Sequence, residues 1–280
     1  MRYTYCLNSV LRWALLGIFT WGACSGTYSA EVDTVYVYSP SMGKLIPNLV
    51  ILPDAYDSAP NGLAVVYLLH GAGGDYTQWV SVSPELPAYA DQYGVIVVCP
   101  DGGLTSWYLD SPVDSTQKYG TYLSEELVTW VDAHICTRPD RAQRAISGLS
   151  MGGHGALLAA IRYPQTWGAV GSTSGGVDIR PFPHNWDLPL RLGPADQFPQ
   201  HWEAHSVLAQ AARLSNNDFA LYVDCGTEDF FLKANRSFHQ RLTRLGIPHV
   251  YEEFPGAHNG LYWRKALPRH LAFFDQFFNP

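Results

Sequence analysis

The sequence predicts an α/β protein with a mostly parallel central sheet that is covered by helices on both faces. From Leu63 onward, short continuous apolar runs alternate with longer segments of helical character. Unbroken apolar strands are typical of a sheet buried on both sides, and strand–helix alternation is typical of parallel pairing. The 280 residues are 47% hydrophobic, and no repeat, linker or low-complexity tract divides them. We therefore expect one domain over residues 31–280.

The elements follow from these patterns in chain order. Two alternating stretches, residues 34–38 and 48–52, are bounded by Pro or Gly and predict an antiparallel hairpin at the sheet edge. The expected buried strands are residues 65–69, 95–99, 142–146, 169–173, 221–224 and 250–254. The expected helices are residues 84–93, 121–135, 154–163, 230–245 and 264–278.

Residues 1–30 have the features of a secretory signal peptide. Arg2 gives a positive start, residues 10–21 are apolar except for Arg12, and small residues follow. The segment Gly22-Ala23-Cys24 also resembles a lipoprotein cleavage site, which would leave a lipid anchor on Cys24. Because Trp21 stands where that site prefers a small aliphatic residue, ordinary cleavage near Ala30 is the alternative, and a retained membrane anchor is a third. We expect an exported protein, either periplasmic, secreted or held at the outer membrane.

The composition excludes several classes of partner. Only 15% of residues are charged, the formal net charge is −7, and Lys and Arg do not cluster. Nucleic acid and anionic membrane surfaces are therefore not expected partners. Cys99, Cys136 and Cys225 lack the spacing of a zinc site, and buried thiols are expected. His201 and His205 are four residues apart but lack the glutamate of a metalloprotease helix, so no metal or cofactor is expected.

The strongest chemical signal is Gly148-Leu149-Ser150-Met151-Gly152. This G-x-S-x-G sequence lies between an apolar strand and an alanine-rich helical segment, which is the context of a nucleophile elbow. The sharp turn projects the serine hydroxyl from the sheet edge, and glycines flank it because larger side chains would collide. The sequence therefore predicts Ser150 as a catalytic nucleophile.

An acid and a histidine follow Ser150 in the order that an α/β-hydrolase requires. One predicted strand leads into a loop with three carboxylates, Asp224, Glu228 and Asp229, and the next leads to His258. Asp229 is our candidate for the acid, with Asp224 and Glu228 as alternatives. His258 is the candidate base because it lies on a loop after a strand, whereas His239, His249 and His270 fall on predicted strand or helix surfaces.

Upstream, a strand opens into His70-Gly71-Ala72-Gly73-Gly74. A glycine-rich loop at this place brings a backbone N–H toward the serine, and we expect the oxyanion hole to consist of the N–H groups of Ala72 and Met151. His70 is expected to brace the loop by hydrogen bonds rather than to act in catalysis.

With these motifs the chain resembles the esterase D-like branch of the α/β-hydrolases, over residues 34–278. That branch includes S-formylglutathione hydrolases, feruloyl and acetylxylan esterases, and mycolyltransferases. The resemblance implies an α/β-hydrolase fold and a serine esterase with a Ser150, Asp229 and His258 triad. After the histidine this chain has Asn259-Gly260-Leu261, where many relatives carry Trp or Thr. The matching segments are Leu68 to Gly74 with Trp79, Pro100-Asp101-Gly102-Gly103 with Ser106-Trp107-Tyr108, Ile146 to Gly153, Gly226 to Phe230, and Gly256-Ala257-His258-Asn259.

Two long loops, residues 101–118 and 175–217, are expected to form the pocket walls, because α/β folds bind substrates beyond the strand ends. Trp107 is the one substrate contact that we single out. The expected activity is hydrolysis of short-chain acyl or aryl esters, small molecules or polysaccharide-linked, by an exported enzyme. The alternatives are an acyltransferase to a sugar acceptor, which would use the same triad, and a non-catalytic carbohydrate-binding protein.

Overall fold

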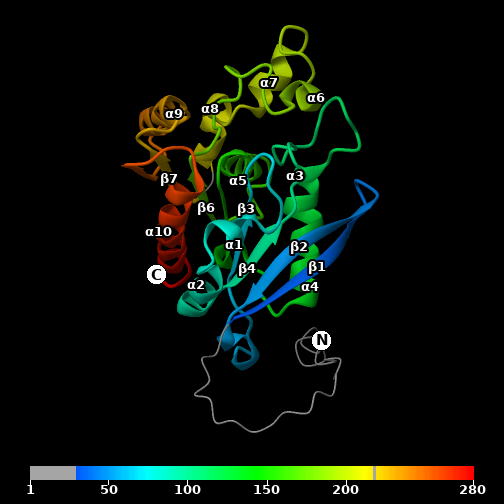
Figure 1. Ribbon diagram of the computed structural model, residues 1–280, viewed down its shortest axis with the longest axis vertical. Coiled ribbons are helices and arrows are strands. Elements are labelled where there is room, and N and C mark those ends of the chain that lie inside the picture. The colour runs from blue at the N-terminus through cyan, green and yellow to red at the C-terminus, as the bar shows by residue number, and fades with distance from the viewer. Residues whose placement is uncertain (1–29, 217–218) are drawn as a thin grey trace.

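The computed structural model describes residues 30–216 and 219–280, and its centre is one eight-stranded sheet (Figure 1). The strand order is β1-β2-β4-β3-β5-β6-β7-β8. The predicted signal peptide, with Cys24, lies almost wholly outside the described residues. The strands are β1 (Glu31–Ser39), β2 (Lys44–Leu52), β3 (Val65–Leu69), β4 (Ile96–Pro100), β5 (Arg144–Gly148), β6 (Ala169–Thr173), β7 (Ala220–Gly226) and β8 (Val250–Phe254).

The predicted edge hairpin is confirmed, since β1 and β2 pair antiparallel from Glu31↔Leu52 to Ser39↔Lys44. β2 then pairs antiparallel with β4, and every later pairing in the sheet is parallel. Parallel strands point their carboxyl ends toward one edge. The loops after β3, β5, β7 and β8 therefore converge there, and these are the loops that carry the candidate site residues.

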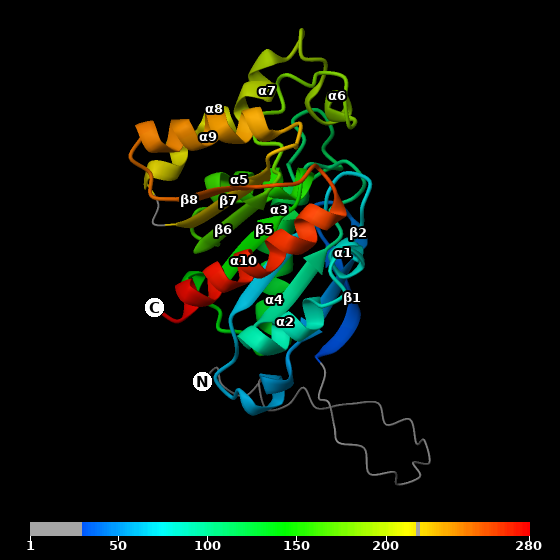
Figure 2. The ribbon, with the colours of Figure 1, turned by 60° about the vertical axis from the view of Figure 1, so that its left-hand side comes forward.

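Both faces of the sheet are buried, which explains why the central strands are apolar without alternation. Along β3, Val65, Tyr67 and Leu69 join one core cluster, whereas Val66 and Leu68 join the other. Helices α4 (Val128–His134), α5 (Met151–Arg162) and α9 (Leu232–Arg244) pack on the first face. Helices α1 (Gln78–Val82), α2 (Leu86–Tyr93) and α10 (Gly260–Phe278) cover the second face, and Figure 2 shows α10 crossing it.

The helix boundaries differ from the predicted ones where local capping decides them. α5 begins at Met151, directly after the serine, and α10 begins at Gly260 because the Asn259 side chain accepts a hydrogen bond from the Tyr262 N–H. The helix expected over 121–135 has three consecutive parts. These are α3 (Tyr119–Thr121), the π-helical turn η2 (Tyr122–Leu127) and α4.

The long insertion before β7 forms a cap beyond the carboxyl ends of the strands (Figures 1 and 2). This segment was predicted to be a loop, but it holds α6 (Leu188–Leu192), α7 (Pro199–His205), α8 (Val207–Gln210) and the 3₁₀ turn η4 (Ala211–Asn216). Two further 3₁₀ turns are η1 (Asp54–Ser58) and η3 (Arg141–Gln143). Among the described helices, none combines the length and the apolar character needed to cross a bilayer.

Candidate active site

Ser150 lies at the sharp turn between β5 and α5, with φ 55° and ψ −115°. A positive φ is strained for a residue with a side chain. The turn is held because the Ser150 N–H donates to the Thr173 carbonyl at 3.1 Å. A Cβ at Gly148 would lie 2.4 Å from the backbone of Gly152, and one at Gly152 would lie 2.3 Å from the Leu69 carbonyl oxygen. The glycines are therefore required by close backbone approach.

Ser150, His258 and Asp229 form a continuous hydrogen-bonded series. His258 Nε2 lies 2.8 Å from Ser150 Oγ, and His258 Nδ1 lies 2.8 Å from Asp229 Oδ2. The carboxylate can only accept, so Nδ1 carries the proton and Nε2 is free to take one from the serine. The side chain of Asp229 is 0% exposed and that of His258 is 14% exposed. The structure thus brings together the three residues that we proposed from three separate loops.

Of the three carboxylates in the loop after β7, only Asp229 reaches His258. Its other oxygen accepts a hydrogen bond from the Phe231 N–H at 2.8 Å, which fixes the carboxylate orientation. Glu228 is exposed. Asp224 is buried within the core and accepts a hydrogen bond from the Tyr262 hydroxyl at 2.7 Å. The alternatives left open by the sequence are therefore excluded by position.

Aromatic rings surround the imidazole of His258. The ring centroids of Phe230 and Phe231 lie 4.3 and 5.4 Å from it, and Trp263 meets it edge-on at 5.1 Å. Trp186, from the cap, stacks on Phe230 at 6.1 Å. Phe230 remains 54% exposed, so it offers an apolar surface beside the nucleophile. These rings were not predicted to be site residues. The available signal was that two phenylalanines directly follow Asp229.

The backbone N–H groups of Met151 and Ala72, predicted to bind an oxyanion, both lie close to Ser150 in the chain or in space. Met151 is the first residue of α5, and a helix leaves its first N–H groups without intrahelical acceptors. In the glycine-rich loop, the N–H groups of Gly71 and Gly73 are both bonded, whereas that of Ala72 has no protein acceptor among the described residues. A Cβ at Gly71 would lie 3.4 Å from Ser150 Cβ, so the loop passes beside the nucleophile.

His70 braces this loop, as predicted. Its Nε2 accepts a hydrogen bond from the Gly102 N–H at 2.8 Å, so Nδ1 carries the proton and donates to the Gly71 carbonyl at 2.8 Å. Burial lowers the pKa of His70, which keeps the ring neutral and able to accept from the amide. The hydroxyl of Tyr108 accepts from the His70 N–H at 2.9 Å and holds the same loop from behind.

Trp107 does not occupy the place that the sequence analysis expected. It is 1% exposed and lies behind the site, so it offers no surface to a substrate. Its backbone N–H donates to Met151 Sδ at 3.3 Å, and its ring packs against His154 at 5.1 Å and Trp186 at 5.8 Å. Trp107 therefore supports Trp186 and Met151, and Phe230 is the exposed ring instead.

A second Ser–His–Asp arrangement lies in the core. His270 Nδ1 is 2.9 Å from Ser147 Oγ, and His270 Nε2 is 2.5 Å from Asp224 Oδ2. His270 and Asp224 are 1% and 0% exposed, so no substrate reaches them. The expectation that His270 lies on a helix surface was wrong, because it faces inward from α10. This network ties α10 to β5 and β7 beneath the site.

His154, on α5 behind the site, makes stability depend on pH. Its ring nitrogens face the carbonyl oxygens of His205 at 2.8 Å and Trp107 at 3.3 Å, but burial is the larger influence and lowers its pKa to about 4. An unfolded histidine titrates near 6.5. Above that pH neither state is protonated, and between pH 6.5 and 4 only the unfolded state gains the proton. We expect this difference in protonation to lower the free energy of unfolding by about 3 kcal/mol as the pH falls from 6.5 to 4.

Urea unfolding of the wild type and of His154→Gln at pH 7 and pH 4.5 measures this contribution. Glutamine retains an N–H donor for the His205 carbonyl but does not titrate. The variant should lose markedly less stability than the wild type on acidification. An equal loss in both proteins would show that other groups account for the dependence.

Comparisons with known proteins find esterases among the similar chains. A family model named Esterase, described as "Putative esterase", matches residues 39–274. An esterase of Mycobacterium tuberculosis, Rv1288, is 29% identical over 75% of this chain and 51% of its own length. An acetyl esterase of Caldicellulosiruptor saccharolyticus is 26% identical over 82% of this chain and 92% of its own. A solved ferulic acid esterase is 26% identical, with a TM-score of 0.76 over 90% of this chain and all of that one.

The chain spans about half the length of the mycobacterial esterases that it matches. A solved S-formylglutathione hydrolase of Staphylococcus aureus has a TM-score of 0.76 at 21% identity, over 88% of this chain and 99% of that one. At this identity the similarity is one of fold. The α/β-hydrolase fold expected from the sequence is confirmed by these neighbours and by the observed sheet.

Proposed function

This chain belongs to the Esterase family, and we propose that it is a serine esterase that hydrolyses short-chain acyl or aryl carboxylic esters. The observation that carries the proposal is the series of two 2.8 Å hydrogen bonds from Asp229 through His258 to Ser150. Such an arrangement activates a serine for attack on a carbonyl.

The proposed reaction has two halves. His258 Nε2 takes the hydroxyl proton of Ser150 as its oxygen attacks the ester carbonyl, and Asp229 stabilises the resulting imidazolium. The N–H groups of Ala72 and Met151 bind the tetrahedral oxyanion, and each such donor is typically worth about 3 kcal/mol. His258 then protonates the departing alcohol, which leaves an acyl group on Ser150. Water repeats the sequence, with His258 as its base, and the acid is released.

The exposed aromatic surface supports aryl esters among the substrates. Phe230 lies at the rim of the site and stacks with Trp186, which offers a face for a planar acyl group. The acetyl esterase and ferulic acid esterase relatives support the same range of acyl groups. Both kinds of ester occur on carbohydrate, and we include carbohydrate-linked esters in the proposal.

Replacing Phe230 by alanine tests this role. We expect kcat/KM for methyl ferulate to fall about fivefold, because a half-exposed phenylalanine contributes about 1 kcal/mol on burial. For p-nitrophenyl acetate, whose acyl group has no ring to pack on Phe230, the change should be within twofold. Leu261→Ala is the matched control, because Leu261 is another exposed apolar side chain and follows His258 by three residues in the sequence. Equal losses for both esters would remove Phe230 from acyl recognition.

An acyltransferase is the second candidate, because an Ag85B diacylglycerol acyltransferase/mycolyltransferase of Mycolicibacterium smegmatis is 28% identical over 90% of this chain and 88% of its own length. In that case a sugar hydroxyl would replace water in the second half-reaction. Mass spectrometry of products made with and without added sugars separates the two. Hydrolysis predicts free acid in both samples, whereas transfer predicts acylated sugar at the expense of acid.

We further propose that the enzyme is exported, on the basis of residues 1–30 of the sequence. Intact-mass analysis of the protein expressed with its full leader distinguishes the alternatives. Cleavage near Ala30 gives an unmodified product, cleavage before Cys24 gives a lipidated one, and retention of the full mass in the cytoplasm would contradict export.

A further inference from the structure

A cavity of about 230 Å³ lies beside the C-terminal half of α5, away from the nucleophile. The loop that contains Asp110, the α5 residues Leu158 and Arg162, and His205 of α7 contribute to its wall. None of Ser150, Asp229 and His258 lines it. It is smaller than the roughly 300–1,000 Å³ of pockets for drug-sized ligands, so its size suits a single ring.

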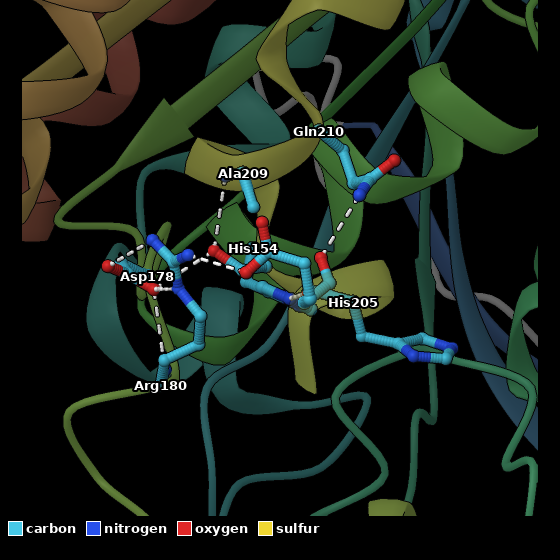
Figure 3. A network of polar contacts seen from close by, with 8 residues as sticks. His154, Asp178, Arg180, His205, Ala209 and Gln210 are labelled. Atoms are coloured by element: carbon cyan, nitrogen blue, oxygen red, sulfur yellow. Dashed lines mark hydrogen bonds and ion pairs between the residues drawn. The ribbon is translucent and has the colours of Figure 1, made fainter. Parts of the chain in front are cut away.

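His205 places an acceptor in this cavity. The residue is only 9% exposed, and its Nδ1 donates to the His201 carbonyl at 2.7 Å. Burial lowers the pKa of His205, so the ring is neutral and Nε2 holds a lone pair. Nε2 has no protein partner among the described residues. Figure 3 shows the His205 ring pointing away from the network that involves its own carbonyl and His154.

The charged groups of the cavity are not paired with each other. Arg162 donates through one Nη to the Ala204 carbonyl at 2.8 Å, and its other N–H groups have no protein acceptor in the described part of the chain. Asp110 accepts from the Thr121 N–H and hydroxyl at 3.0 and 2.6 Å, and faces the Tyr163 hydroxyl at 3.4 Å. The cavity therefore offers a cation, an anion, a hydroxyl and a neutral acceptor together.

This combination disfavours charged ligands of either sign. An anion attracted by Arg162 would also meet the carboxylate of Asp110 and the lone pair of His205. A cation attracted by Asp110 would meet the guanidinium. A hydroxyl, in contrast, donates to Asp110 or His205 and accepts from Arg162, and the buried side chain of Leu158 suits the apolar face of a ring.

We propose that this cavity is a second binding site, separate from the catalytic serine, for a neutral polyhydroxylated molecule of about one sugar ring. The proposal does not depend on esterase activity. Among these polar groups His205 is buried, Asp110 is half-buried and Arg162 is exposed. A ligand that lacks the hydroxyl facing His205 would leave that buried acceptor unsatisfied, which gives the site its selectivity.

Saturation-transfer NMR of the whole protein tests the proposal with four methyl glycosides at millimolar concentration. Two are neutral, the xyloside and the glucoside, and two are charged, the glucuronide and the glucosaminide. We expect saturation transfer to at least one neutral glycoside and several-fold weaker binding of both charged ones. Arg162→Met should weaken binding of the neutral glycoside about tenfold, because one charged hydrogen bond is lost. Arg236→Met, which removes an exposed arginine paired with Glu253, should leave this binding unchanged.

Asp110→Asn provides an independent check, because the amide keeps an acceptor for Thr121 but no longer repels an anion. Binding of the glucuronide should rise in this variant relative to the wild type. Thermal unfolding shows that each variant is folded. Absence of saturation transfer to both neutral glycosides, binding unchanged in Arg162→Met, or a preference of the wild type for the glucuronide would each overturn the proposal.

Discussion

Ser150→Ala should reduce the turnover of p-nitrophenyl acetate by roughly 10⁴–10⁶-fold, because no other hydroxyl lies within hydrogen-bonding distance of His258 Nε2 in the described structure. The fold should persist. Alanine keeps the Cβ at the strained turn, where φ is 55°, and the bonds that hold the turn involve only the backbone. The measurement is kcat for both proteins at pH 8, with urea unfolding as the check on stability.

Labelling by a fluorophosphonate gives a second readout for the same substitution. The wild type should gain one covalent adduct on the peptide that contains Ser150, and the variant should gain none. Turnover of Ser150→Ala at the wild-type rate, or an adduct on another serine, would reject Ser150 as the nucleophile. A folded wild type with neither turnover nor adduct would favour the non-catalytic alternative.

Asp229→Asn should lower kcat by about 10⁴-fold, the size of effect seen when a triad acid becomes an amide. The carboxylate accepts the Nδ1 proton of His258, which leaves Nε2 free to act as a base. An amide can present its own N–H to Nδ1 instead. The proton then moves to Nε2, where it points at Ser150 and blocks the transfer.

Asp224→Asn is the matched control, since it makes the same change to a buried aspartate five residues earlier. Asp224 holds His270, Tyr262 and Thr173, all within the core. Loss of that charge should lower the free energy of unfolding by about 3 kcal/mol, the lower end of the cost of breaking a buried pair. It should change kcat by less than tenfold. If Asp224→Asn loses turnover as Asp229→Asn does, the assignment of the acid is wrong.

The residues of the proposed triad were predictable because their signals are local. Gly148 and Gly152 flank Ser150 at a spacing that sterics impose, and the loops with Asp229 and His258 follow strands in an order that the parallel sheet imposes. The hydrogen-bonding role of His70 in the glycine-rich loop was also predicted correctly, because it too is local. The same holds for the hairpin of β1 and β2, whose alternating polar and apolar residues indicate an edge of the sheet.

Other residues were misplaced because their surroundings come from distant parts of the chain. His270 was predicted on a helix surface because it is polar, yet it lies on the buried face of α10, where Ser147 of β5 and Asp224 of β7 bind its two ring nitrogens. Trp107 lies on a polar loop that suggested a pocket wall. The cap residue Trp186 covers it, at a ring distance of 5.8 Å.

The sequence by itself therefore determined the fold class, the nucleophile elbow and the loops of the proposed triad, because each depends on backbone geometry over a few consecutive residues. Only the tertiary structure decided between Asp224 and Asp229, the aromatic surface around His258, and the cavity of Arg162, Asp110 and His205. Those features depend on side-chain packing between elements tens of residues apart. Hydrophobic periodicity states which face of an element is buried, but not which partner buries it.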